Sequence, residues 1–234
     1  MKNNYSIVRS DSSFEILRVD NICHSYPVHT HNRVCMGRID SGRKILKIND
    51  KQYSLEKDQW FFIPAHVPHS CYDDDRYGKT GYTVFCADTV EILINAIRHY
   101  DIDLSTSVMT NTEDVSTCLK RTEYIDEIDS LISKVKDFIE KNYEQSLTNN
   151  QLAVKFCLSP FHLLHRFKKA TGLSLHQFIL QTRVRKFREN AEQKKTITEQ
   201  ALECGFYDQS HLNRIFKRYI GITPFEYVKS VRKI

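Results

Sequence analysis

The chain has 234 residues, 41% hydrophobic and 27% charged, a composition that suffices for the cores of two modest domains and excludes an intrinsically disordered chain. Its start lacks the apolar segment of a secretion signal, and no window approaches the roughly 18 uncharged apolar residues of a membrane span, so we expect a cytoplasmic protein with no membrane partner. The net charge of +5 is uneven, because residues 1–125 contain 15 Lys and Arg against 17 Asp and Glu, whereas residues 126–234 contain 19 against 12. Only the C-terminal half is therefore expected to meet a polyanion.

Residues from about Phe14 to Phe85 show the pattern of a β domain. Short alternating runs such as KILKI, QYSL, WFFIP and YTVFC are separated by turn-forming pairs, among them Ser41-Gly42 and Asn49-Asp50. Strands at this spacing, with no helices between them, predict an antiparallel β-barrel or β-sandwich.

An amphipathic helix is expected after these strands, because apolar residues recur at helical spacing at Val90, Leu93, Ile94 and Ile97. Residues 101–127 are polar and have no sustained period, and we interpret them as a linker. The predicted organisation is therefore a mainly β domain at 1–100, the linker at 101–127, and a second domain at 128–234.

The second domain has the apolar period of helices throughout. We expect seven of them, near residues 129–142, 148–156, 160–171, 175–192, 198–204, 209–220 and 224–231. Several expected starts carry cap chemistry, such as Ser159 before Pro160 and Thr223 before Pro224. The predicted fold class is α+β, an antiparallel β-barrel followed by an all-α domain.

An internal repeat lies within the helical half. At an offset of 49 residues the chain matches itself at His162 and His211, Leu163 and Leu212, Phe167 and Phe216, Lys168 and Lys217, Lys169 and Arg218, Gly172 and Gly221, and Phe178 and Tyr227. Each copy has the pattern of a short helix, a tight turn and a second helix that ends at glycine. The sequence therefore predicts two helix-turn-helix motifs.

In the second copy, a helical projection separates a core face from an outward face. The core face consists of Leu212, Ile215, Phe216 and Tyr219. The outward face carries amide, hydroxyl and cationic groups and no acidic ones, and such groups can read base edges, Arg on guanine and Asn or Gln on adenine. The DNA-binding candidates of this copy are Gln209, Ser210, Asn213, Arg214 and Lys217.

In the first copy, the predicted core face consists of Leu163, Phe167 and Ala170. The DNA-binding candidates on the opposite face are Phe161, Leu164, His165 and Lys168. An outward Phe161 either contacts a thymine methyl group or packs beneath a neighbouring loop. Arg166 lies at the edge of the core face, where a phosphate contact is the most that we expect of it.

A helix rich in basic residues lies between the two copies and contains Arg183, Arg185, Lys186 and Arg188. Such a run of charge usually forms a solvated face. We favour the interpretation that this helix is a rigid spacer, which sets the two recognition helices roughly one DNA turn apart.

These motifs resemble the AraC/XylS family of transcription regulators. The resemblance is carried by CGFYDQSHLNRIFKRYIGITPFEY at 204–227 and, less strongly, by LAVKFCLSPFHLLHRFKKATGLS at 152–174. It implies that the two recognition helices enter adjacent major grooves. The implied base contacts are Phe161, Leu164 and His165 in the first motif and Gln209, Ser210, Asn213 and Arg214 in the second. His165 stands where the family usually has Arg, and since a histidine contact is weaker and sensitive to pH, we expect sequence readout to depend mainly on the second motif.

The N-terminal half resembles the cupin-like sensor domains of the same family. The matching residues are HTH at 29–31, the strand region from Gly42 to Leu55 and DQWFFIPAHVPHS at 58–70. The resemblance implies a barrel that holds a small effector, with DNA affinity or dimer geometry changed on binding. We expect a small-molecule effector near His29, His31, His69 and Tyr82, and homodimerisation through this half.

A metal site in the barrel is the alternative to an effector pocket. His29 and His31 are two residues apart, so on a strand both side chains lie on the same face, and His69 is expected to join them. This resembles a metal-binding cupin, but Cys35 stands where such cupins have glutamate. Three histidines and a cysteine still suit zinc or iron. We favour ordinary pocket or core histidines, and we predict no metal, cofactor or catalytic residue.

The function expected from these features is that of a sequence-specific regulator which binds double-stranded DNA and, as most of the family do, activates transcription through RNA polymerase. One alternative is a metal-dependent cupin enzyme with an accessory helical domain. Another is an architectural protein that binds DNA without sequence choice. The sequence shows no nucleophile constellation, phosphate loop or dinucleotide fingerprint, which favours a protein that is not an enzyme.

Overall fold

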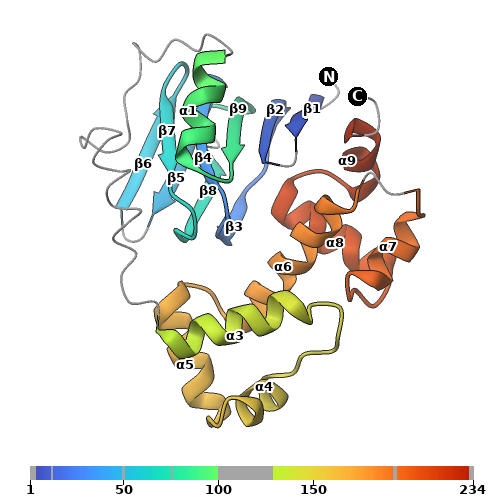
Figure 1. Ribbon diagram of the computed structural model, residues 1–234. Helices are drawn as coiled ribbons and strands as arrows, with labels where there is room; N and C mark the ends of the chain where they lie inside the picture. The colour runs from blue at the N-terminus through green and yellow to red at the C-terminus, as the bar shows by residue number, and fades with distance from the viewer. Residues whose placement is uncertain are drawn as a thin grey trace. The chain divides into compact units, whose positions relative to one another are not determined.

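The computed structural model describes residues 4–11, 13–48, 51–74, 76–99, 129–191 and 194–231 (Figure 1). These residues belong to two compact units, which we call the β unit and the α unit. The linker expected at 101–127 lies outside the described residues, so the domain boundaries stay a prediction. Among the helices of the described ranges, none combines the length and hydropathy of a membrane-crossing segment.

The β unit contains two antiparallel sheets in the ranges that the structure describes, which confirms the expected fold (Figure 1). One sheet has the strand order β1-β2-β9-β4-β7 and the other β3-β8-β5-β6. The strands are β1 (Asn4–Asp11), β2 (Phe14–Ile22), β3 (Tyr26–His29), β4 (Val34–Ser41), β5 (Arg43–Ile48), β6 (Lys51–Glu56), β7 (Trp60–Ile63), β8 (His69–Asp73) and β9 (Thr80–Ala87). The sequence pattern indicated strands only from Phe14 onward and missed β1, which pairs with β2 alone.

The core of the β unit lies between the two sheets. It includes Val19, Ile39, Leu46, Phe61 and Tyr82, which are inward-facing residues of β2, β4, β5, β7 and β9. The opposite face of the five-stranded sheet is buried as well, because helix α1 (Val90–His99), at the expected position, packs Leu93 against Trp60 and Phe85. The five-stranded sheet is therefore buried on both of its faces.

The α unit consists, in its described part, of the seven expected helices. They are α3 (Ser130–Lys141), α4 (Asn149–Lys155), α5 (Pro160–Thr171), α6 (Leu175–Glu189), α7 (Ile197–Glu203), α8 (Gln209–Ile220) and α9 (Pro224–Val231). α6 ends at Glu189, three residues before its expected end. The two helix-turn-helix motifs are α4 with α5 and α7 with α8.

The expected cap chemistry sets these helix ends. Ser159 and Asp208 accept hydrogen bonds from the backbone N–H groups of His162 and His211, and so fix the starts of α5 and α8. Both helices end at a glycine in the left-handed conformation, with φ of +70° at Gly172 and +87° at Gly221. The two recognition helices thus have the same length and the same caps.

Helix α6 joins the cores of the two motifs. In its first half, Phe178 packs edge to face on Phe167 of α5, with ring centroids 5.4 Å apart. In its second half, Phe187 packs on Phe216 of α8 at 5.3 Å, and Phe216 packs on Tyr227 of α9 at the same distance. Packing at both ends of one helix makes the α unit a single rigid scaffold for α5 and α8.

Candidate DNA-binding face and barrel site

The recognition helix of the second motif, α8, has the two faces that the sequence predicts. Its buried residues are Leu212, Ile215, Phe216 and Tyr219, which confirms the predicted core face. On the other side, four of the DNA-binding candidates are exposed and Asn213 is half-buried; the exposed ones are Gln209, Ser210, Arg214 and Lys217.

Most polar groups on this face of α8 make no hydrogen bond or ion pair within the described residues. Within the described residues, neither Arg214 nor Lys217 makes a hydrogen bond or an ion pair. Gln209 accepts a hydrogen bond of 2.7 Å from Thr198 Oγ1, which orients its side chain at the start of the helix. The face therefore offers two unpaired cations and one oriented amide to an external partner.

The recognition helix of the first motif, α5, differs in part from its prediction. Leu163 and Phe167 are buried as expected, but Ala170 is exposed. The chain turns at Gly172 and brings Leu173 into the core, and this residue takes the place expected for Ala170. The helical period of 3.6 residues predicts Ala170 in the core because it assumes that the helix continues. It cannot predict that Leu173, beyond the end of the helix, fills this position instead.

The DNA-binding candidates on α5 are less uniform than those on α8. Phe161 is 73% exposed, and its ring stacks on that of His165 with centroids 6.2 Å apart. Lys168 is exposed, whereas Leu164 is half-buried and packs against the core of the first motif. The outward face of α5 is therefore formed mainly by Phe161, His165 and Lys168.

Arg166 has an internal partner. Its guanidinium forms a two-point ion pair with Asp129, in which Nη2 lies 2.7 Å from Oδ1. The hydrogen bond from Arg166 is the largest of the effects that lower the pKa of the Asp129 carboxyl. Since Asp129 also caps α3, the pair ties the recognition helix to the first helix of the unit.

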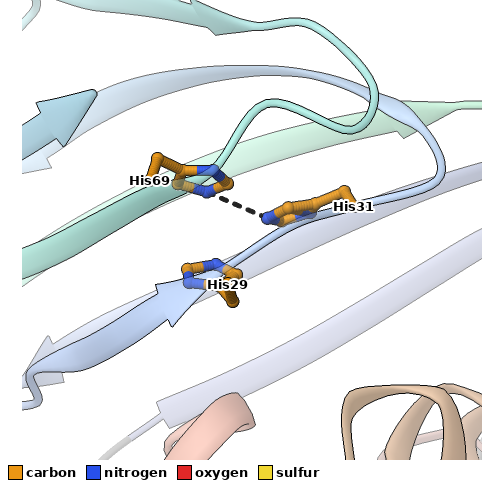
Figure 2. Close-up of side chains that lie close together, drawn as sticks. All are labelled: His29, His31 and His69. Atoms are coloured by element: carbon orange, nitrogen blue, oxygen red, sulfur yellow. Dashed lines mark hydrogen bonds between the residues drawn. The ribbon is translucent and has the colours of Figure 1, made fainter. Parts of the chain in front are cut away.

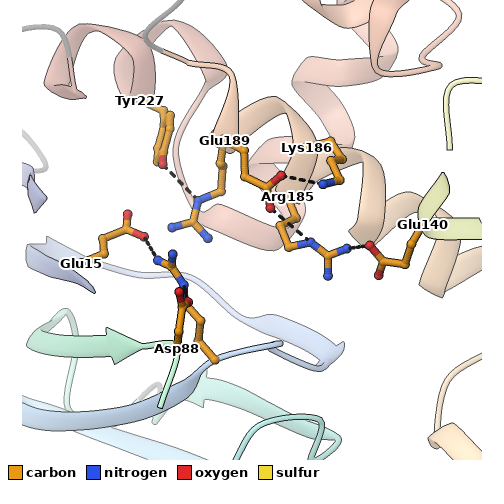
Figure 3. A network of polar contacts seen from close by, with 9 residues as sticks. Glu15, Asp88, Glu140, Arg185, Lys186, Glu189 and Tyr227 are labelled. Carbon is orange, nitrogen blue, oxygen red and sulfur yellow. Dashed lines mark hydrogen bonds and ion pairs between the residues drawn. The ribbon is translucent and has the colours of Figure 1, made fainter. Parts of the chain in front are cut away.

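The basic residues of α6 likewise make internal contacts (Figure 3). Arg183 is buried and donates from Nε to the carbonyl oxygen of Tyr143 at 2.8 Å. Arg185 forms an ion pair with Glu140 of α3, and Lys186 pairs with Glu189 at 2.8 Å. These contacts support the interpretation of α6 as a rigid spacer rather than a solvated basic face.

In the β unit, the structure brings His29, His31 and His69 together (Figure 2). His31 Nε2 lies 3.1 Å from His69 Nε2, and the centroids of the His29 and His69 rings are 4.2 Å apart. His29 ends β3, and His69, the first residue of β8, is its antiparallel partner. Strand pairing thus brings together His29 and His69, 40 residues apart in the chain, whereas His31 lies two residues beyond the end of β3 and not on the strand where the sequence placed it.

Burial keeps two of these histidines, His29 and His69, neutral. The pKa of His29 is lowered to about 4, mainly because burial disfavours the charged ring. The pKa of His69 is lowered well below its usual value, first by burial and then by the proximity of His29 and His31. At neutral pH His29 and His69 are therefore uncharged imidazoles, each with one proton and one lone pair.

Tyr82 belongs to a neighbouring polar group. Its hydroxyl is hydrogen-bonded to that of Tyr26, whose ring lies 6.2 Å from the ring of His29. Burial is the main cause that raises the pKa of Tyr26. Lys44 Nζ lies 5.1 Å from the Tyr82 ring and forms a buried ion pair with Asp73 at 2.7 Å.

Sequence reasoning missed most of this polar group, namely Tyr26, Lys44 and Asp73. It also missed Cys86, which lies directly opposite Cys35 on the β4–β9 ladder, with the two sulfur atoms 2.9 Å apart. The signal for Cys86 is the strand register, which a single sequence does not reveal.

Comparisons with known proteins agree with this two-part organisation. Residues 12–87 match the AraC-like ligand binding domain family, and residues 152–230 match a helix-turn-helix domain family. The multiple antibiotic resistance protein MarA of Escherichia coli is 37% identical over 100 residues, which are 41% of this chain and 76% of MarA. The Msm operon regulatory protein of Streptococcus mutans is 33% identical over 102 residues, 43% of this chain and 37% of that protein.

Among solved structures, that of ToxT from Vibrio cholerae covers 96% of this chain and is itself covered completely, with a TM-score of 0.57 and 13% sequence identity. At that identity the likeness concerns the fold alone. The domain matches and the MarA relationship carry the assignment: the chain belongs to the AraC family of DNA-binding transcription regulators, with a ligand-binding domain before its helix-turn-helix domain.

Proposed function

We propose that this regulator recognises a specific DNA sequence chiefly through α8, assisted by α5, and that a small effector held in the β unit controls it. The observation that carries the proposal is the outward face of α8, where Arg214 and Lys217 are exposed and make no polar contact within the described residues. Elsewhere in the unit, Arg166, Arg183 and Arg185 are held by internal partners.

The position of each candidate along α8 suggests its role. Residues in the first turns of a recognition helix contact base edges, whereas later cations contact phosphate. Gln209, Ser210, Asn213 and Arg214 occupy the first half of the helix, and Lys217 the second half. We therefore assign base reading to the first four and phosphate contact to Lys217.

On α5 the proposal assigns the corresponding contacts to Phe161, His165 and Lys168, and to Leu164 a smaller part, since it is half-buried. At the offset of the repeat, His165 corresponds to Arg214. An imidazole cannot present two parallel N–H donors as a guanidinium does, so the first motif contributes less discrimination between bases.

The proposal includes activation through RNA polymerase and dimerisation through the β unit, and both rest on the family assignment. In the β unit, the effector region comprises His29, His31 and His69 with the neighbouring Tyr82, where buried polar groups converge between the two sheets. Buried polar groups of this kind fix the orientation of a small ligand.

The test of DNA recognition compares affinity for a selected genomic fragment with affinity for random duplex at one salt concentration. We expect Arg214→Ala to lose roughly 1–3 kcal/mol on the selected fragment and to relax specificity at one base pair. Lys217→Ala should weaken binding to both duplexes equally. Lys229→Ala, an exposed cation on α9, is the matched control and should bind like the wild type.

Two results would contradict the proposal. Equal affinity of the wild type for both duplexes would indicate an architectural protein. An equal loss on both duplexes for Arg214→Ala would make Arg214 a phosphate contact and remove base reading from this position.

A further inference from the structure

The hydrogen bonds of the histidine cluster determine which nitrogen of His29 and which nitrogen of His69 is available. His29 Nδ1 lies 2.7 Å from the carbonyl oxygen of Pro27, and His69 Nδ1 lies 2.9 Å from that of Val67. A carbonyl oxygen only accepts, so in both rings Nδ1 carries the proton and Nε2 carries the lone pair. His31 Nδ1 lies 3.3 Å from Cys35 Sγ, which can hold a proton on that nitrogen in the same way.

The Nε2 atoms of His31 and His69 face one another at 3.1 Å. Two lone pairs at this distance repel each other unless a proton or a cation lies between them. Ligand atoms from all three histidines lie within 4.8 Å of one another. Zn–N bonds of about 2.0–2.1 Å in tetrahedral geometry place two nitrogen ligands roughly 3.3 Å apart, close to the observed separation.

The surroundings of the three rings are those of a metal site. Each Nδ1 contacts a backbone carbonyl or a sulfur atom, and such second contacts orient histidine ligands in metalloproteins. His29 and His69 lie opposite each other on paired strands, and His31 follows two residues after the end of β3, so the three rings need no large movement to bind one ion. The sequence favoured ordinary pocket histidines because neither these contacts nor the facing nitrogens can be read from spacing.

We propose that the effector of the β unit is a divalent transition metal ion, zinc in particular, bound through Nε2 of His29, His31 and His69. The inference rests on the proposed regulatory role of this site and names its ligand. Three neutral imidazoles suit zinc and leave the fourth tetrahedral position to water or to an anionic small molecule.

Cys35 has a defined part in this site. Its sulfur lies at Nδ1 of His31, on the edge of the ring away from Nε2, so Cys35 orients the ligand and is not itself a ligand. Cys86, 2.9 Å from Cys35, holds that sulfur in place from the adjacent strand. The site therefore differs from one in which a side chain at position 35 coordinates the metal directly.

The first experiment measures binding of Zn²⁺ and Co²⁺ to the reduced full-length protein. We expect one ion per chain, with the visible spectrum of tetrahedral Co²⁺ and without the near-ultraviolet band of a thiolate–cobalt bond. His31→Gln and His69→Ala should each weaken binding about 100-fold or more, and Cys35→Ser, an orienting residue, about 10–100-fold. His176→Ala, an exposed histidine of α6, is the control and should bind like the wild type.

Unchanged binding in both His31→Gln and His69→Ala, each with the circular dichroism spectrum of the wild type, would overturn the metal site. A strong thiolate–cobalt band that disappears in Cys35→Ser would overturn the assignment of Cys35 as a residue outside the coordination sphere.

The second experiment measures affinity for the selected DNA fragment with Zn²⁺ and with a chelator. A change of at least fivefold that is absent in His31→Gln supports zinc as the effector. Zinc binding with no change in DNA affinity would overturn the regulatory role and leave the site intact. Loss of sequence preference in the metal-loaded wild type would contradict the proposed DNA recognition instead.

Discussion

Arg166 and Arg214 both lie on recognition helices, but Arg166 forms an internal ion pair, whereas Arg214 is exposed. At the offset of the repeat, Arg166 corresponds to Ile215, which is buried in the second motif. An arginine at the edge of a core needs a partner, and Asp129 supplies one. Arg214 corresponds to His165 and lies on the outward face of its helix, where it makes no polar contact within the described ranges. Position relative to the core therefore decides which arginine is available to DNA.

The Asp129–Arg166 pair predicts how stability depends on pH. A carboxyl whose pKa is lowered on folding stabilises the native state above its unfolded pKa of about 3.9, and this contribution is lost as the pH falls through the folded value. Asp129→Asn keeps a capping oxygen but removes the charge. We expect it to destabilise by less than about 1 kcal/mol at pH 7, because the pair is partly exposed, and by a smaller amount at pH 3, below the unfolded pKa.

Urea unfolding of the wild type and Asp129→Asn at the two pH values measures this difference. Arg166→Gln should give the same pH dependence, since it removes the other half of the pair. An equal difference between wild type and variant at both pH values would show that Asp129 acts through its cap alone.

At the scale of elements, the two helix-turn-helix motifs have the same type of turn between their helices, but different residues occupy its left-handed position. The residue after the C-cap of the first helix has positive φ in both, +80° at Gly205 and +55° at Cys157. A Cβ at Gly205 would lie 2.7 Å from the carbonyl oxygen of Tyr143 and 2.8 Å from that of Glu144. The second motif therefore packs its turn directly against backbone, which only glycine permits.

This difference predicts opposite effects of two substitutions. Gly205→Ala introduces both backbone strain and a close contact with fixed carbonyl groups, so we expect a loss of about 2–4 kcal/mol. Cys157→Gly relieves the strain of a left-handed residue at an exposed position and should change stability by no more than about 1 kcal/mol, in the stabilising direction. Thermal unfolding of both variants measures the effects, and a tolerated Gly205→Ala would contradict the close packing of this turn.

For the whole molecule, the division of charge matches the division into units. The α unit carries the basic excess and the two recognition helices, while the β unit encloses neutral histidines and a buried Lys44–Asp73 ion pair. Inside the α unit, α6 connects the two motifs, so the relative placement of α5 and α8 depends on its packing. Two recognition helices read one duplex only if their spacing is held constant.

Phe187 provides a test of this connection. It is fully buried against Phe216, and Phe187→Ala should destabilise the α unit by about 3–5 kcal/mol and weaken DNA binding, although Phe187 lies in the core. Val154→Ala, at a side chain 78% exposed, is the control and should leave both quantities unchanged. DNA affinity measured well below the melting temperature of the variant distinguishes a change in the placement of α5 and α8 from unfolding. If Phe187→Ala bound DNA with the affinity of the wild type, the role of α6 as a spacer would be contradicted.

Local patterns in the sequence were sufficient for the helices of the α unit and for the core face of α8. Apolar spacing and caps such as Ser159 and Asp208 act within one or two turns, so they can be read from neighbouring residues. They failed at Ala170, where the chain reverses, and at β1, whose edge strand has no strong alternation. The resemblance of residues 152–174 and 204–227 to the AraC family was equally local.

By itself, the sequence determined the fold class, the duplicated motif, the family and the exposed candidates of α8. Tertiary structure alone decided which charged groups are already paired, as Arg166 and Arg185 are, and which atoms face one another in the barrel. Strand register brings Cys86 opposite Cys35 and His69 opposite His29, and register depends on contacts between segments far apart in the chain. Helical periodicity is local, whereas pairing between strands is not, and that is the physical reason for the division.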